Sequence, residues 1–298
     1  LLFLAVVLLG GCATTPPLSD TTRSALPERH VNASVPFHGQ RDYQCGPATL
    51  AMLLEHGGRP ASVDELIPQV FLPGREGSVQ PEMLAAVRRH GLIPFVIPGR
   101  FDALLREVNA DHPVAVLQNL SLPWWPAWHY AVVVGYDLGT ETLLLHSGET
   151  PRRSVGWGRF DATWARSDRW AFVALPPGEL PASPLGRRAA EAVAAFESVQ
   201  GAEAALPAWQ GLAQRAPDLG MAQFGLGNAL VAVGRPEASL DPFRRAGESD
   251  PGFAAAWLNL GLVLRSLGRS DAANEALRRA AAIAGPLQSR AVELIEAD

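Results

Sequence analysis

The chain of 298 residues is 48% hydrophobic with a formal net charge of −5, enough apolar material for a sizeable core and a second folded unit. It contains no lysine, which excludes a Walker A phosphate loop, a Schiff-base lysine and a Ser-Lys dyad, because each needs the ammonium group. A negative charge without a basic cluster argues against a nucleic-acid partner, since phosphate contacts need clustered basic residues.

The first eleven residues, LLFLAVVLLGG, are uninterruptedly apolar and precede Cys12. This stretch is shorter than the roughly 20 residues of a spanning helix and has the length of a signal-peptide core. Residues 1–12 resemble a bacterial lipoprotein signal with its lipobox; the alternative is a buried strand with an incidental cysteine. The resemblance implies that Cys12 is acylated, that residues 13–32 form a flexible tether, and that the protein sits in the cell envelope, on the periplasmic face of the outer membrane.

Cys45 stands in QRDYQCGPA, residues 40–48, at the expected start of a helix over residues 45–55. The helix dipole and the unpaired N–H groups there favour a negative charge, so we expect a lowered thiol pKa and rapid alkylation below pH 7. With Cys12 acylated, Cys45 has no intrachain disulfide partner, which favours a thiol that is used. An inert buried cysteine is the alternative.

After that helix the pattern predicts further helices and then short β-branched strands separated by Gly, Asp and Pro turns. A helix follows Ser62, with Glu65 completing a capping box, and two more are expected over residues 81–90 and 103–109. Strands are expected over residues 113–119, 129–137, 142–148, 152–157 and 169–175. Helices followed by strands indicate an α+β domain with a mainly antiparallel sheet.

His129 begins the strongest of these strands, HYAVVVGYD. The ordered set QCGPATL, HYAVVVGYD and TLLLHSG resembles the papain-like double-glycine peptidases known from bacteriocin processing, over residues 33–176. The resemblance implies that Cys45 is the nucleophile, His129 its base and Gln40 an oxyanion donor, with Gln44 competing for the last role. Cysteine attack needs such an imidazole, and a Gln amide with a backbone N–H can hold the oxyanion.

The third catalytic residue departs from the family pattern, which places an Asp about sixteen to eighteen positions beyond the histidine. This chain instead reads LHSGE and has no Asp there. His146 or Ser147 could orient the imidazole, and Glu149 is a third alternative, because a neutral orienting residue suffices for a Cys-His pair. Asp137 lies roughly 25 Å along the strand and is too far away.

Three tryptophans, Trp124, Trp125 and Trp128, directly precede His129. Their amphipathic rings suit a substrate-groove wall or lid, and core packing is the alternative. We expect no metal site, since the sequence has no His-Glu-x-x-His and no cysteine pair, and no cofactor. The histidines His30, His38, His56, His90 and His112 are expected to face solvent or end helices.

A Pro-rich linker over residues 177–186 marks a domain boundary. Beyond it, over residues 187–298, Leu226-Gly227 recurs thirty-four residues later as Leu260-Gly261. That period resembles tetratricopeptide repeats, with a degenerate pair over residues 187–215, and the alternative is a generic Ala-rich helical bundle. Such an array implies a protein or peptide partner.

The leading functional hypothesis is a lipid-anchored cysteine peptidase whose repeat domain recruits a protein or peptide substrate. A catalytically inactive envelope adaptor that acts through its repeats is the second hypothesis, which the missing Asp supports. A Cys-dependent acyl transferase is the third, because it uses the same Cys-His pair. The sequence does not name the substrate.

Overall fold

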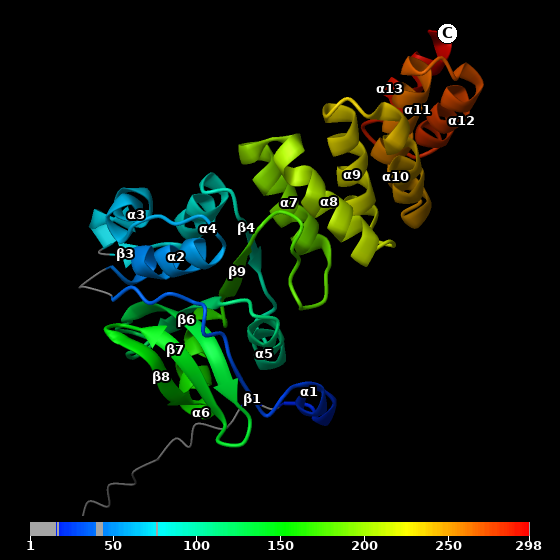
Figure 1. Cartoon of the computed structure of the whole chain (residues 1–298). Coiled ribbons are helices and arrows are strands. Elements are labelled where there is room, and N and C mark those ends of the chain that lie inside the picture. The colour runs from blue at the N-terminus through cyan, green and yellow to red at the C-terminus, as the bar shows by residue number, and fades with distance from the viewer. Residues whose placement is uncertain (1–15, 17, 40–43, 76, 298) are drawn as a thin grey trace, which may run out of the picture.

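The structure is a computed structural model that describes residues 16, 18–39, 44–75 and 77–297. An N-terminal domain of helices and an antiparallel sheet is followed by an all-helical array (Figure 1), which is the predicted fold class. Within the described residues, no helix combines the length and hydropathy needed to cross a bilayer.

The described part of the N-terminal domain contains one main sheet of seven antiparallel strands. Their order is β4 (Ile93–Val96), β9 (Ala171–Leu175), β5 (Val114–Asn119), β6 (Trp128–Asp137), β7 (Thr142–Ser147) and β8 (Thr150–Gly156), with β1 (Arg29–Val31) paired to the far end of β6. Its helices are α1 (Asp20–Ala25), α2 (Cys45–His56), α3 (Val63–Val70), α4 (Gln80–Arg89), α5 (Phe101–Asn109) and α6 (Trp157–Trp164). A separate ladder joins β2 (Phe71–Leu72) to β3 (Gly77–Ser78), and η1 (Pro73–Arg75) and η2 (Ala165–Ser167) are short 3₁₀ turns.

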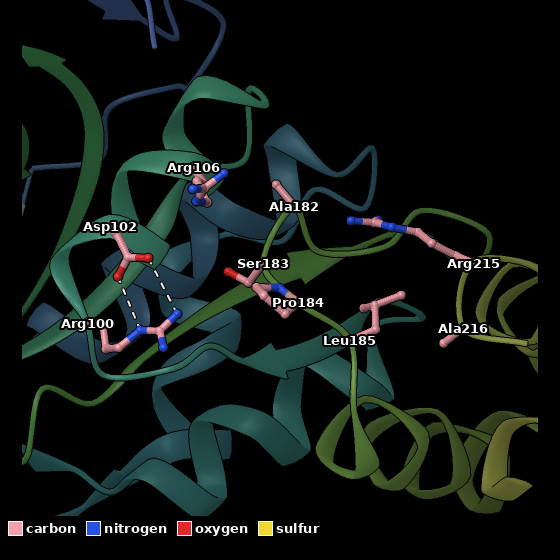
Figure 2. A pocket seen from close by; sticks show the side chains of 9 residues that line it. All are labelled: Arg100, Asp102, Arg106, Ala182, Ser183, Pro184, Leu185, Arg215 and Ala216. Atoms are coloured by element: carbon pink, nitrogen blue, oxygen red, sulfur yellow. Dashed lines mark hydrogen bonds and ion pairs between the residues drawn. The ribbon is translucent and has the colours of Figure 1, made fainter. Parts of the chain in front are cut away.

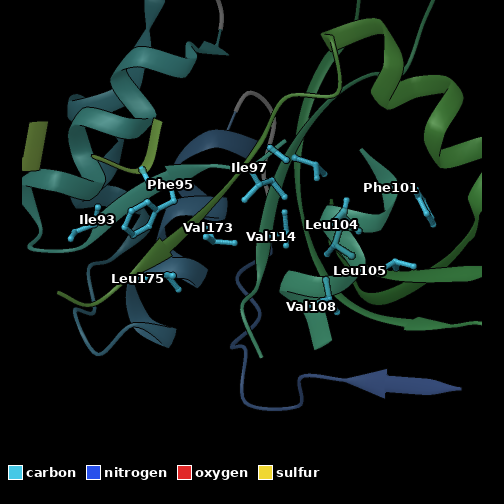
Figure 3. Packing of buried hydrophobic residues seen from close by; sticks show 14 of the residues in the cluster. Ile93, Phe95, Ile97, Phe101, Leu104, Leu105, Val108, Val114, Val173 and Leu175 are labelled. Carbon is cyan, nitrogen blue, oxygen red and sulfur yellow. The ribbon is translucent and has the colours of Figure 1, made fainter. Parts of the chain in front are cut away.

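Helices cover both faces of the sheet, which explains why β6 is apolar at nearly every position. Tyr130, Val132 and Val134 share a buried cluster with α2, whereas Ala131 and Val133 share one with α5 and α6. Figure 3 shows α5 packed beside the sheet strands in this second cluster.

The predicted capping box at the start of α3 is confirmed. The Ser62 hydroxyl accepts from the Glu65 N–H at 3.3 Å, and the Glu65 carboxylate accepts from the Ser62 N–H at 2.8 Å. Two orphan donors of the first turn are thereby satisfied.

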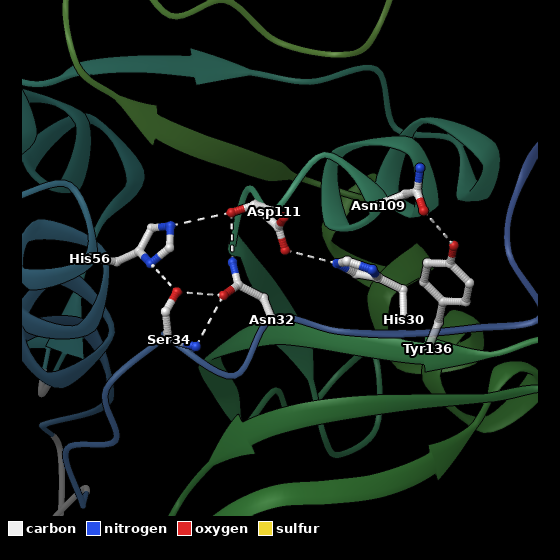
Figure 4. A network of polar contacts seen from close by, with 7 residues as sticks. All are labelled: His30, Asn32, Ser34, His56, Asn109, Asp111 and Tyr136. Atoms are coloured by element: carbon white, nitrogen blue, oxygen red, sulfur yellow. Dashed lines mark hydrogen bonds and ion pairs between the residues drawn. The ribbon is translucent and has the colours of Figure 1, made fainter.

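The prediction of a flexible tether over residues 13–32 is wrong from residue 20 onward, where α1 and β1 form. β1 pairs with β6 beyond the end of β5, so it satisfies backbone groups that β5 leaves open. Buried Asn32 then donates to the Asp111 carbonyl at 2.6 Å, and His30 Nε2 bonds the Asp111 carboxylate at 2.9 Å (Figure 4). Residues 1–15 and 17, including Cys12, lie outside the described residues.

The C-terminal array consists of helix pairs, as the 34-residue period predicts. The pairs are α7 (Arg187–Gln200) with α8 (Ala202–Arg215), α9 (Gly220–Ala232) with α10 (Pro236–Ser249), and α11 (Ala254–Ser266) with α12 (Ser270–Ala281), followed by α13 (Gln288–Glu296). Glycines let large rings approach neighbouring helices: a Cβ on Gly227 would lie 2.6 Å from the Phe243 ring, and Gly247 faces Trp257 in the same way. Small residues at these crossings allow the pairs to stack.

The linker between β9 and α7 is bound to the N-terminal domain by Glu107, a fully buried carboxylate on α5. Glu107 accepts from the backbone N–H groups of Ala182 and Ser183 at 2.9 and 2.8 Å, from the Ser183 hydroxyl at 2.6 Å, and from His112 Nδ1 at 2.8 Å. Burial alone would raise the pKa of Glu107, but these hydrogen bonds hold it below its ordinary value. His112 follows the end of α5, as expected of a helix-end residue, and its side chain bonds the buried Glu107 carboxylate.

Candidate active site

Cys45 is the first residue of α2, and its half-buried thiol lies against the beginning of β6. The Tyr130 backbone N–H donates to the sulfur, and the N–H groups of Cys45 and Gly46 at the helix start also favour its charged form. Gly46 is required locally, because a Cβ there would lie 2.6 Å from Ser78 Cβ and 3.3 Å from Met83 Sδ. The helix start is thus held tightly between β6 and β3.

The thiol pKa is raised, so the expectation of a lowered pKa is wrong. Burial of Cys45 is the largest effect and outweighs the three backbone N–H groups that stabilise the thiolate. The sequence correctly identified a helix start with unpaired N–H groups, but the extent of desolvation depends on packing against Tyr130 and is not visible in the sequence.

His129 lies at the same end of β6, one residue before Tyr130. Its Nε2 is 2.9 Å from the Ser147 hydroxyl, and its pKa is lowered, first by burial and then by the positive charge of Arg153. Among the described contacts the imidazole bonds to Ser147 and not to the thiol. The Cys45 thiol accepts from the backbone N–H of Tyr130, the residue that follows His129, so both residues lie at the start of β6. Within the described residues, Nδ1 of His129 makes no hydrogen bond.

Ser147 and His146 are neighbours on β7 and point to opposite faces of the sheet. His146 is buried, its Nδ1 accepts the Arg152 N–H at 3.1 Å, and its Nε2 donates to the Val35 carbonyl at 3.3 Å. His146 therefore anchors the segment that leads towards Cys45, and Ser147 is the residue that reaches His129. Glu149 is exposed in the turn after β7.

The predicted oxyanion donor Gln40 lies outside the described residues. Gln44 occupies the N-cap of α2, and its side chain makes no capping hydrogen bond. The described donors close to the thiol are the backbone N–H groups of Tyr130, Cys45 and Gly46, the last two at the helix start. Such groups can stabilise an oxyanion at a helix start.

The tryptophans before His129 are strongly exposed, so the core-packing alternative is wrong: Trp124 is 78%, Trp125 77% and Trp128 51% exposed. Buried Asn119 holds their loop closed, since its Oδ1 accepts the N–H groups of Ser121 and Ala127, both at 3.0 Å. Asn119 was not among the predicted site residues; its signal in the sequence is its position at the end of a predicted strand, before a Pro-rich aromatic turn.

No group of three or more His, Cys, Asp or Glu side chains within the described part of the chain could hold a metal ion. The arrangement at Cys45 instead offers a nucleophile, a base with a hydroxyl partner, and helix-start N–H donors. This set suits acyl chemistry on a carbonyl group.

Two protein-family models match separate parts of the chain. Residues 32–171 match the Peptidase_C39 like family, and residues 199–252 and 224–288 match the Tetratricopeptide repeat family. No curated protein sequence matches the chain.

Solved structures similar to the chain fall into the same two groups. A protein described as a C39-like peptidase from Bacillus anthracis is 16% identical with a TM-score of 0.42, and the match covers 50% of this chain and 98% of that one. A double glycine motif protease from an AMS/PCAT transporter, solved with the leader peptide, is 19% identical with a TM-score of 0.37, covering 48% and 93%. MamA is 24% identical with a TM-score of 0.34; the match covers 36% of this chain and spans 63% of MamA.

Proposed function

The chain consists of a peptidase C39-like domain followed by tetratricopeptide repeats, and from this premise we propose that it is a cysteine peptidase that hydrolyses peptide bonds in a recruited protein or peptide. One observation supports this most strongly. The Cys45 thiol sits at a helix start against the first residues of β6, where His129 bonds through Nε2 to Ser147.

The proposed mechanism begins with an uncharged Cys45 thiol and an uncharged His129 imidazole. Nδ1 of His129 removes the thiol proton as Sγ of Cys45 forms a bond to the scissile carbonyl carbon, and the N–H groups of Cys45 and Gly46 stabilise the oxyanion. The imidazolium returns the proton to the departing amine when the C–N bond breaks. Water, deprotonated by His129, then hydrolyses the thioester and frees the thiol. Gln40 remains the proposed side-chain donor to the oxyanion.

Digestion of a peptide mixture, with new termini identified by mass spectrometry, tests this function. New termini that disappear in His129→Gln would support it. Products carrying an added amine, in place of free carboxyl termini, would point to acyl transfer by the same pair.

An inactive adaptor is the second candidate. The raised thiol pKa and the hydroxyl, rather than a carboxylate, beside His129 both favour it. Under this alternative the digestion produces no new termini, and partner capture by the full chain is the same with and without Cys45.

We propose that the repeats recruit the substrate, and that Cys12 attaches the protein to the envelope membrane through a lipid. The location proposal depends on residues 1–12 of the sequence. Mass spectrometry of the mature protein from a bacterial host tests it, since an unmodified Cys12 would contradict it.

Alkylation of Cys45 by iodoacetamide is expected to be slow at pH 7 and to accelerate as the pH rises above 9, because burial raises the thiol pKa. Mass spectrometry of the tryptic peptide of residues 42–75, which contains Cys45 but not Cys12, reports the labelling of Cys45 alone. The unfolded chain is the control and should react faster at pH 7. Faster labelling of the folded chain at pH 6 would instead reveal a thiolate-imidazolium pair.

Ser147→Ala should reduce kcat by about tenfold to a hundredfold with little change in KM, because the imidazole loses the partner that holds its orientation. Ser147→Asn should restore part of the activity, since an amide oxygen can accept the Nε2 proton. The pH profile of kcat should shift in the alanine variant. Unchanged kcat and an unchanged profile would show that Ser147 does not orient His129.

Trp124→Ala combined with Trp125→Ala should raise KM by about tenfold while leaving kcat nearly unchanged, if the two rings bind substrate away from the reacting bond. Because both rings are more than three-quarters exposed, the unfolding temperature should not change. An unchanged KM would remove these tryptophans from the proposed groove.

A further inference from the structure

A cavity of about 460 Å³ lies away from Cys45, where α5, the linker and the end of α8 come together. Figure 2 shows its side chains: Arg100, Asp102 and Arg106 come from the peptidase side, Pro184 and Leu185 from the linker, and Arg215 from the repeat side. Its walls therefore belong to both domains. A volume of this size falls within the range of small-molecule sites.

The charged side chains that line the cavity carry more positive than negative charge. Arg100 bonds Asp102 through Nε and Nη2 at 3.2 and 3.4 Å, which leaves Arg106 and Arg215 without a carboxylate partner among the described residues. Within the part of the chain that the structure describes, Arg106 donates only to the Thr22 hydroxyl at 3.1 Å, and Arg215 only to the Leu180 carbonyl at 3.4 Å. The lining side chains, three guanidinium groups and one carboxylate, sum to a charge of +2, and the Glu107 carboxylate is bonded to the lining residues Ala182 and Ser183.

The geometry points to a binding site for a small dianion, either a phosphate group or a dicarboxylate, held between Arg106 and Arg215. Each guanidinium presents five donors in a planar fork that matches the oxygen atoms of both groups. The site is preformed, because Glu107 fixes the linker at Ala182 and Ser183 beside it. An occupant would join α5 to the end of α8 and so hold the repeat domain on the peptidase domain.

Calorimetric titration of the full chain tests the site with inorganic phosphate and, separately, with succinate. We expect saturable one-site binding of at least one probe with a Kd of about 1 mM or tighter, and a higher unfolding temperature in its presence. Phosphate without succinate would assign a phosphate ligand, and succinate without phosphate a dicarboxylate. Arg215→Gln should weaken binding at least tenfold; its side chain is exposed, so its own unfolding temperature should match wild type.

Arg290→Gln is the matched control, since it removes one exposed arginine on α13, far along the array. It should leave binding unchanged. The proposal is overturned if neither probe saturates, if Arg215→Gln binds as tightly as wild type, if Arg290→Gln loses as much affinity, or if acetate competes as well as the dianions.

Discussion

Cys45→Ala is expected to reduce kcat/KM for peptide cleavage by at least about 10³-fold, because the variant has no sulfur to attack the carbonyl. The fold should survive. The side chain is half-buried and small, and its loss removes one N–H···S contact with Tyr130, for a change in the free energy of unfolding of about 1 kcal/mol.

Cys45→Ser provides the matched comparison, since it keeps the side-chain shape but replaces the thiol with a far less acidic hydroxyl. It should be nearly as inactive as Cys45→Ala, with wild-type circular dichroism. Cleavage at the wild-type rate by either variant, at the same sites, would eliminate Cys45 as the nucleophile and leave the adaptor hypothesis.

Glu107→Ala should lower the free energy of unfolding by about 3–5 kcal/mol, measured by urea denaturation. The substitution leaves donors of His112, Ala182 and Ser183 without their acceptor in a buried site. Glu107→Gln keeps one accepting oxygen and should fall between wild type and alanine.

Glu191→Ala is the control, because Glu191 is exposed and makes only an i,i+4 pair with Arg187, worth at most about 0.5 kcal/mol. The contribution of Glu107 to the free energy of unfolding should also depend on pH. Its folded-state pKa lies below the ordinary value of 4.5, so its contribution is present above pH 4.5 and is lost as the pH falls through the folded-state pKa. A Glu107→Ala variant as stable as Glu191→Ala would show that the linker is not held by this carboxylate.

Local pattern predicted most elements of the N-terminal domain, and the missed ones have physical explanations. β4 contains Pro94, which is tolerated because β4 is an edge strand paired only with β9. α6 begins after Gly156 without a side-chain cap, so its start carries no sequence signal. α1 and β1 were assigned to a tether because the pairing of β1 with β6 joins residues more than a hundred positions apart.

Sequence alone was sufficient for the α+β domain and the repeat period, because helix starts, strand alternation and a 34-residue period can be recognised in the order of the residues. The residues proposed for catalysis came from the resemblance to double-glycine peptidases. Tertiary structure decided the environment of those residues. Packing against Tyr130 desolvates Cys45 and raises its pKa, and the facing direction of β7 residues selects Ser147 over His146 beside His129. The raised pKa of Cys45 and the pairing of His129 with Ser147 both depend on contacts between segments that are distant in the sequence. The burial and charge around a side chain are set by the residues that pack against it.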